Sequence, residues 1–362
     1  MRIRPRSAFA AVLALGGFLA LHESALALTN QEIAKLTGPD RQKILEEGAK
    51  KEGKVVIYSS LIVNQLLRPW GDAFEKKYPG VKFEYWRGDT GPILAKMTTE
   101  RQAKNQQFDV MEYSGTAIMT AIKAGAAESF TSPVLQTDFE PDTYDTQTGF
   151  WAGSRTSYFG LAYNTKLVSA APKTFEDLLD PKWQGKMAWE TSDTGRVQFI
   201  TNTLLTMGEK GGEEYLKKLS TQKITPSTAS ARALVDRVGQ GEYPIALHIY
   251  AHHPLISKAD GAPLDSSMIE PIDSGLAGIQ LGKDAPHPHA AMLLIDFILG
   301  REAQTIARDA DYFPVNTKVE PKDSMKTIVP RVIGKKERVF RPETLFAHRE
   351  RSLEMVKKYF DN

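Results

Sequence analysis

Segments typical of buried strands alternate with segments typical of helices along the first third of the sequence. The expected strands are 54–58, 81–86 and 108–112. The expected helices are 39–52, 64–78, 93–103 and 117–124. Parallel strands need long crossover connections, and helices at this spacing supply them. The alternation therefore predicts a mostly parallel sheet covered by helices, which is an α/β fold.

Polar residues follow each expected strand. Ser59 and Ser60 follow the first strand, Arg87 and Thr90 follow the second, and the pair Ser114 and Gly115 ends the third. Ligands of open α/β sheets bind outside the carboxyl ends of the strands. Hydroxyls and backbone amides at helix N-termini attract negative charge. This edge of the sheet is therefore a predicted anion-binding edge.

A second α/β unit follows a polar connection over 131–149. We expect a strand over 156–164, a helix within 172–186 and a short strand over 187–190. Thr191, Ser192 and Asp193 follow that short strand, so they take the position that the serines hold in the first unit. The sequence thus predicts two lobes with one polar edge each.

The N-terminal residues 1–27 have the pattern of a secretory leader. Arg2, Arg4 and Arg6 precede an apolar run over 8–21, and a small-x-small site ends at Ala27. An apolar run of 14 residues is shorter than the roughly 20 that a membrane span needs. We therefore expect export to the periplasm and a mature chain that begins at residue 28.

Composition excludes some classes of site. The chain has no cysteine, so thiolate catalysis and cysteine-rich metal sites are ruled out. Its 46 basic and 44 acidic residues nearly balance, and no nucleic-acid partner is expected. A Gly-x-Ser-x-Gly elbow, a phosphate-binding P-loop and a His-Glu-x-x-His motif are all absent from the sequence. We expect no enzyme and no cofactor, with a periplasmic hydrolase as an alternative of another class.

Several ordered segments together resemble the family 1 extracellular solute-binding proteins of ABC importers, and specifically the group related to the ferric-iron-binding branch. The segments are 52–58, 108–110, 161–165, 172–186, 241–246, 290–299, 301–304 and 312–315. The resemblance implies the two-lobed type II periplasmic-binding-protein fold, with a ligand clamped between discontinuous lobes by hinge closure. The implied parts are a leader (1–27), lobe 1 (28–150), lobe 2 (151–271), a return to lobe 1 (272–318) and C-terminal helices on lobe 2 (319–362).

The iron-binding branch holds its metal with two adjacent tyrosines, usually helped by a histidine after the first strand. Here the pair reads Ile249-Tyr250, and the loop after the first strand has no histidine. One phenolate donor of the hard set that suits a trivalent cation is missing. A metal held by Tyr250, His248 and His252 stays open as an alternative, because the two histidines would share a face if that segment is helical.

The anion hypothesis needs a positively charged group. Arg87 could grip a carboxylate or phosphonate bidentately, and Arg155, Arg196 and Arg232 are second-lobe candidates. Asp193 would repel an anion unless it pairs with Arg196 or receives a ligand amine, which an amino-bearing anion would supply. The expected ligand-binding residues are Ser59, Ser60, Arg87, Thr90, Ser114, Gly115, Tyr158, Thr191, Ser192, Asp193, Arg196, His248 and Tyr250.

The resulting expectation is a monomeric periplasmic subunit that delivers a small anionic solute to an ABC permease in the inner membrane. The solute would be an organic carboxylate, a phosphonate or an amino-bearing anion. Ferric iron or a ferric complex is the alternative cargo. A sensor role would use the same fold with a different partner.

Overall fold

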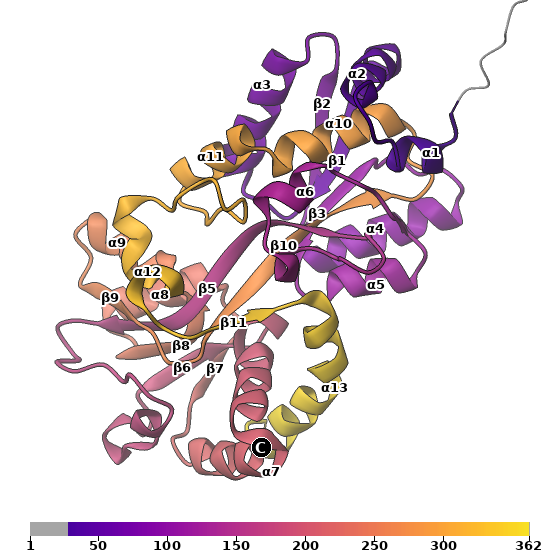
Figure 1. Ribbon diagram of the computed structural model, residues 1–362. Coiled ribbons are helices and arrows are strands. Elements are labelled where there is room, and N and C mark those ends of the chain that lie inside the picture. Colours follow the sequence, from indigo (N-terminus) through magenta and orange to yellow (C-terminus); the bar gives the residue numbers. More distant parts are fainter. Residues whose placement is uncertain (1–27, 362) are drawn as a thin grey trace, which may run out of the picture.

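The computed structural model describes residues 28–361, so the expected leader lies outside the described residues. Two α/β lobes are joined by two long strands that run through the waist of the molecule (Figure 1). The spatial order of the strands is β2-β1-β3-β10-β5-β8-β6-β7. The fold is therefore the two-lobed α/β arrangement that the alternating pattern predicts.

Lobe 1 is built on parallel strands. β1 (Lys54–Ser59) lies between β2 (Lys82–Arg87) and β3 (Val110–Ser114), parallel to both. The covering helices are α1 (Asn30–Ala34), α2 (Arg41–Glu52), α3 (Arg68–Lys77), α4 (Thr90–Gln102), α5 (Ala117–Lys123), α6 (Val134–Asp138), α10 (Pro288–Leu299) and α11 (Arg301–Asp309). Trp70 and Trp151 are buried in one continuous apolar core with α10, a helix apolar on nearly all sides. The chain thus returns to lobe 1 after visiting lobe 2.

Lobe 2 is also built on parallel strands covered by helices. β6 (Met187–Glu190) lies parallel to both β7 (Thr225–Ser227) and β8 (Ile245–Tyr250). Its helices are α7 (Gln198–Ser220), α8 (Ala231–Gln240) and α9 (His252–Ala259). The C-terminal segment adds α12 (Pro330–Ile333) and α13 (Pro342–Tyr359). α13 packs along α7, as Figure 1 shows, and also contacts α5 of lobe 1.

Two strands belong to both lobes. β5 (Ala152–Asn164) pairs with β10 (Ile272–Gly282) through its first half and with β8 and β9 (Leu264–Ser267) through its second half. β10 also pairs with β3, β4 (Ala127–Glu128) and β11 (Glu337–Phe340). All but one residue of β5 is buried. These strands place side chains at the junction of the lobes.

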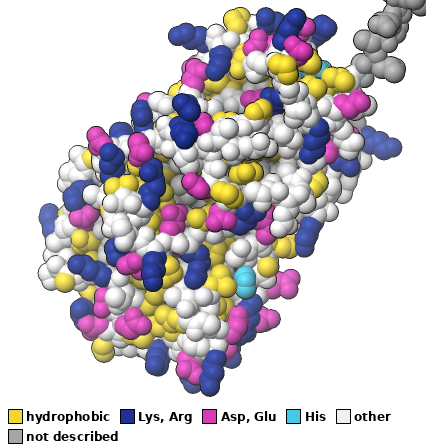
Figure 2. All heavy atoms as spheres, in the orientation of Figure 1, with side chains coloured by type: hydrophobic (Ala, Val, Ile, Leu, Met, Phe, Trp, Pro, Cys, Tyr) yellow, Lys and Arg dark blue, Asp and Glu magenta, His cyan; other side chains and the backbone are white. Residues whose placement is uncertain are grey.

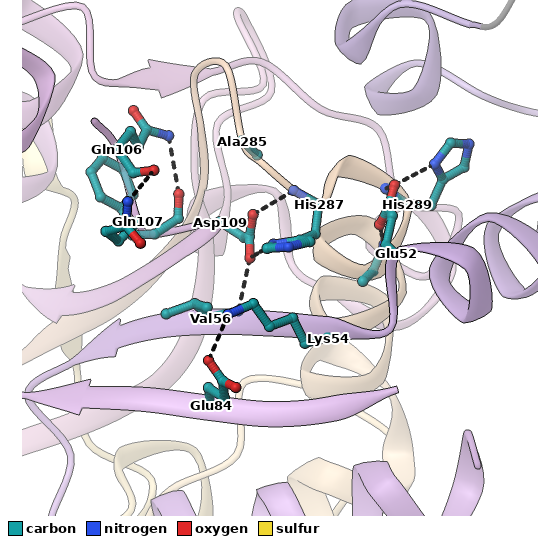
Figure 3. Close-up of polar contacts among 12 residues, drawn as sticks. Glu52, Lys54, Val56, Glu84, Gln106, Gln107, Asp109, Ala285, His287 and His289 are labelled. Atoms are coloured by element: carbon teal, nitrogen blue, oxygen red, sulfur yellow. Dashed lines mark hydrogen bonds and ion pairs between the residues drawn. The ribbon is translucent and has the colours of Figure 1, made fainter. Parts of the chain in front are cut away.

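Carboxylates fix the start of α10 at the pole of lobe 1, as Figure 3 shows. Asp109 accepts hydrogen bonds from the backbone amides of Val56 (2.8 Å) and His287 (2.7 Å). Glu52 accepts from the amides of His289 (3.1 Å) and Ala290 (2.8 Å), which are free donors in the first turn of a helix. This pole lies at the amino ends of β1 and β3, away from the edge where ligands of such sheets bind.

One expected helix is different in the structure. The segment 172–186 forms two short 3-10 helices, Glu176–Leu179 and Pro181–Trp183, instead of one helix. Asp180 between them has extended backbone (ψ 124°), because the residue before a proline is disfavoured in the helical region. The helix expected over 64–78 begins with a π-helical turn over Val63–Leu67 before α3.

Acidic and basic side chains are interspersed over the face of the molecule shown in Figure 2. Many of them form ion pairs between neighbours, such as Lys77 with Glu302 at 2.9 Å. Among residues 28–361, no helix combines the length and the apolar character that crossing a bilayer requires.

Candidate ligand-binding site between the lobes

A narrow recess lies where the crossing strands meet lobe 2. Both lobes contribute to its wall, together with the C-terminal helix α13. Its lining residues are Gly115, Arg155, Ser157, Phe159, Thr194, Gln198, Tyr250, Gly275, Leu276, Ala277 and Leu345. A solute held here would contact the two lobes at once.

The crossing strands determine which side chains face the recess. Arg155, Ser157 and Phe159 alternate along β5, so they project from the same face of the sheet. In register beside them on β10 lie the small residues Ala277 and Gly275. A Cβ on Gly275 would lie 3.1 Å from the Phe159 ring. The absence of a side chain at Gly275 therefore keeps the floor of the recess open.

Arg155 is the charged group of the recess, and it is only 9% exposed. Its Nε makes no hydrogen bond to the protein and lies 3.5 Å from Oε1 of the fully buried Glu112. Hydroxyls of Ser59 (2.8 Å) and Ser154 (3.2 Å) donate to that carboxylate, and the Tyr312 ring lies 5.2 Å from the guanidinium carbon. A buried donor without an acceptor is costly, so Arg155 is prepared for an incoming acceptor.

Gln198 is the second unpartnered donor. It is the first residue of α7, it is 1% exposed, and its Nε2 has no hydrogen-bond partner. Both Arg155 and Gln198 line the recess. Two buried donors without acceptors favour a ligand rich in oxygen, such as a carboxylate or a phosphonate.

Tyr250 completes the polar wall. Its ring lies 4.9 Å from that of Phe159. Burial raises the pKa of Tyr250, although the nearby Arg155 acts in the opposite direction. The phenol is therefore protonated at neutral pH and can donate a hydrogen bond to an anion.

The structure brings only some of the expected residues into this region. Gly115 and Tyr250 line the recess, and Asp193 lines a chamber that adjoins it. Ser114 ends β3, as expected. Ser60, Thr90, Thr191 and Ser192 also lie at the expected strand ends and helix starts but do not line the recess. Ser192, for example, caps the turn that follows β6 by accepting from the Gly195 amide at 3.1 Å.

Other expected residues have protein partners instead. Ser59 donates to Glu112, and the exposed Arg87 pairs with Asp89 at 3.0 Å. Arg196 pairs with Asp361 at 2.6 Å, and Tyr158 packs against Phe313 with 4.8 Å between ring centroids. The sequence could not show these partners, because three of the four lie far away along the chain.

His248 is held by two groups of lobe 2. Its Nδ1 lies 3.0 Å from the Thr194 carbonyl oxygen, and its Nε2 lies 2.6 Å from Oδ2 of Asp273. The ring also stacks on Phe159 at 4.6 Å. Both nitrogens are thus engaged, so His248 is not free to join Tyr250 and His252 at a metal. Residues 28–361 contain no group of three or more His, Asp or Glu side chains placed to hold a metal ion.

His252 and His253 keep buried Nδ1 atoms without hydrogen-bond partners. Burial lowers the pKa of His252 well below its ordinary value and lowers that of His253 to about 4. Both imidazoles are therefore neutral at pH 7, and Arg155 remains the positive charge of the recess.

The sequence placed Gly115 and Tyr250 in the expected set and named Arg155 as a further candidate, but it did not indicate Ser157, Phe159, Gln198 or Gly275. The alternation along β5 could have selected Ser157 and Phe159 together with Arg155. The sequence around Gln198 and Gly275 contains no pattern that would indicate a ligand-binding position. Their roles depend on pairing between segments that are far apart in the sequence.

The family model of the bacterial extracellular solute-binding proteins matches residues 106–334. The chain therefore belongs to this family. Among curated proteins, it is 28% identical over 270 residues to a Salmonella typhimurium protein named for binding 2-aminoethylphosphonate in the periplasm. That match covers 70% of this chain and 74% of the relative.

Solved structures show the same fold. A Trichodesmium protein in complex with iron and citrate superposes with a TM-score of 0.73 at 18% identity, over 85% of this chain and 99% of that one. The periplasmic binding protein AfuA of Actinobacillus pleuropneumoniae, with fructose-6-phosphate bound, superposes with a TM-score of 0.69 at 24% identity. The superposition covers 85% of this chain and 99% of that one. Both are periplasmic-binding-protein structures with two lobes.

Proposed function

We propose that this chain is the periplasmic solute-binding subunit of an ABC importer, and that it captures a small anionic solute in the recess between its lobes. The solute carries a carboxylate or a phosphonate, with or without an amine. The protein acts as a monomer, without turnover, and delivers its cargo to a permease in the inner membrane.

The observation that carries the proposal is that two buried donors of one recess, Arg155 Nε and Gln198 Nε2, make no hydrogen bond. Glu112 balances part of the Arg155 charge from behind, at 3.5 Å. An anionic head group would accept a hydrogen bond from each donor and so remove the free-energy cost of burying donors without acceptors. The named ligand of the Salmonella relative, a phosphonate, belongs to the same chemical class.

Ligand capture by this site would also move the lobes. Gly115 belongs to lobe 1, whereas Thr194 and Gln198 belong to lobe 2, and all three line the recess. A ligand that contacts both lobes binds the closed arrangement more tightly than the open one and so shifts the population toward closure. A permease can then distinguish the loaded protein by its shape.

Ferric iron is the competing cargo, because structures of this fold include an iron complex. Tyr250 is the phenol available for it in the recess, and burial raises the pKa of that phenol, which disfavours a phenolate. The donor set seen here is better suited to an anion than to a bare trivalent cation.

A thermal-shift panel on the purified protein tests the proposal. Propylphosphonate, 2-aminoethylphosphonate, butyrate, β-alanine, ferric chloride and ferric citrate are added separately. Because a ligand that binds only the native state raises its stability, at least one organic anion should raise the melting temperature without iron. A shift with ferric salts alone, together with a visible charge-transfer band lost in Tyr250→Phe, would overturn the anion assignment.

A further inference from the structure

A second narrow chamber adjoins the recess. The two share Gly115, Thr194, Gln198 and Leu345. The remaining lining residues of the chamber are Thr116, Asp193, Val197, Thr201 and Arg349. The tail of a solute whose anionic head lies at Arg155 would therefore point past Gln198 toward Asp193 and Arg349.

The charges of the chamber cancel each other. Arg349 of α13 donates to both carboxylate oxygens of Asp193, through Nε at 2.5 Å and Nη2 at 3.1 Å. Thr116 of lobe 1 approaches the same carboxylate at 3.5 Å. The sequence expectation paired Asp193 with Arg196 or with a ligand amine, but Arg196 pairs with Asp361 instead.

We propose that Arg349, by occupying Asp193, sets the charge preference of the site, so that the protein selects anions with an uncharged tail and disfavours anions with an ammonium tail. This inference rests on the proposed function, and it narrows the solute class within it.

The surroundings of the pair support this preference. An ammonium in the chamber would meet the Arg349 guanidinium and would have to compete with it for Asp193. The Thr201 hydroxyl offers little help, because it already donates to the Val197 carbonyl (3.0 Å) and shares a hydrogen bond with Ser352 (2.7 Å). Val197 and Leu345 instead present apolar surface to a hydrocarbon tail. An uncharged tail gains this contact without having to displace an ion pair.

Two matched ligand pairs test the inference by calorimetric titration. Propylphosphonate and 2-aminoethylphosphonate differ only by a terminal methyl in place of an ammonium, and so do butyrate and β-alanine. The native protein should bind the methyl member of a pair more tightly. In Arg349→Gln, which leaves Asp193 uncompensated, the ratio of affinities should move toward the ammonium member by roughly fivefold or more.

Two further variants distinguish a change in ligand preference from a folding defect. Asp193→Asn, which leaves Arg349 uncompensated, should move the ratio in the opposite direction. Arg351→Gln is the matched control, because Arg351 lies on the same helix but pairs with Glu209 and Glu213 at 3.0 and 2.9 Å, outside the chamber. It should leave the ratio unchanged.

The outcomes separate this inference from the proposed function. Binding of the methyl members with ratios that neither Arg349→Gln nor Asp193→Asn changes would overturn the inference alone. A native preference for the ammonium members would also overturn it. If no member of either pair binds, the proposed function fails and the inference fails with it.

Discussion

At the scale of single residues, the protein leaves two buried hydrogen-bond donors of the recess without acceptors. Arg155 and Gln198 are both buried, and each has a side-chain donor without a partner. Such donors are rare in folded proteins, because the cost of burying them is not recovered until an acceptor arrives. Arg87 differs from Arg155 because it is exposed to water and its carboxylate partner, Asp89, lies at 3.0 Å rather than the 3.5 Å between Arg155 and Glu112.

Gly275→Ala tests the packing of the recess floor. The new Cβ would lie 3.1 Å from the Phe159 ring and 3.5 Å from Gln198 Nε2. We expect weaker anion binding, by roughly tenfold, because the methyl group takes space beside a binding donor. Titration of the variant with propylphosphonate and butyrate measures this. Unchanged affinity for both would show that the ligand head does not lie against Gly275.

His287→Gln tests the carboxylate network at the pole of lobe 1. The Asp109 hydrogen bond raises the pKa of His287 above its ordinary value near 6.5. A raised pKa means that the folded state binds the proton more tightly. The stability from this pair is therefore fully present below about pH 6.5 and is lost as the pH rises through the raised folded pKa. Burial also raises the pKa of Asp109. Its contribution to stability therefore likewise falls as the pH rises, but from a lower pH, because the ordinary pKa of an aspartate is near 3.9.

The expected result is that the difference in melting temperature between the native protein and His287→Gln shrinks as the pH rises above about 6.5, because the contribution of His287 is then lost. Thermal unfolding of the two proteins across this pH range provides the comparison. If the melting temperatures of the two proteins changed in parallel with pH, His287 would not contribute to the pH dependence of stability.

How far single residues could be predicted depends on their partners. The positions of Ser59, Arg87 and Thr90 at strand ends and helix starts follow from local pattern. Whether such a residue faces a ligand depends on distant groups, such as Glu112 for Ser59 and Asp361 for Arg196. Local pattern alone therefore places residues at the strand ends, but it does not select most of the residues that line the candidate recess.

At the scale of elements, the strands and helices of the first lobe could be predicted well, because each carries its own periodic signal. The exceptions have local causes that override that signal. Pro181 divides the expected helix of 172–186. The pairing of β5 with β10, which builds the recess, joins residues more than 100 positions apart and leaves no local trace.

Gly208→Ala tests a kink within α7. Gly208 has φ 74° and ψ 163°, a conformation that residues with a Cβ adopt only with strain. No neighbouring atom lies within 4 Å of the position that its Cβ would take, so the cost is one of backbone conformation. We expect the free energy of unfolding to fall by roughly 1–3 kcal/mol. Denaturant titration measures it, and an unchanged midpoint would contradict the strained geometry.

At the scale of the whole molecule, α13 connects the lobes in addition to the crossing strands. It packs on α7 of lobe 2, and its Phe346 ring lies 4.0 Å from Nζ of Lys123 on α5 of lobe 1. Its Leu345 lines both the recess and the chamber. The C-terminal helix thus contacts both lobes.

Phe346→Ala removes the contact with Lys123 without touching the residues that line the recess. The closed population should fall, because a contact between α5 and α13 is lost in the closed form. We expect a larger radius of gyration in small-angle scattering of the ligand-free variant, restored by a saturating anion. Scattering identical to that of the native protein would show that α13 does not help to hold the lobes together.

The most direct test of the central claim is calorimetric titration of Arg155→Gln with propylphosphonate and butyrate, beside the native protein and Arg87→Gln. We expect Arg155→Gln to bind the preferred anion at least about tenfold more weakly, whereas Arg87→Gln should bind it as the native protein does. Native affinity in Arg155→Gln, or loss of binding in Arg87→Gln alone, would contradict the assignment of the site.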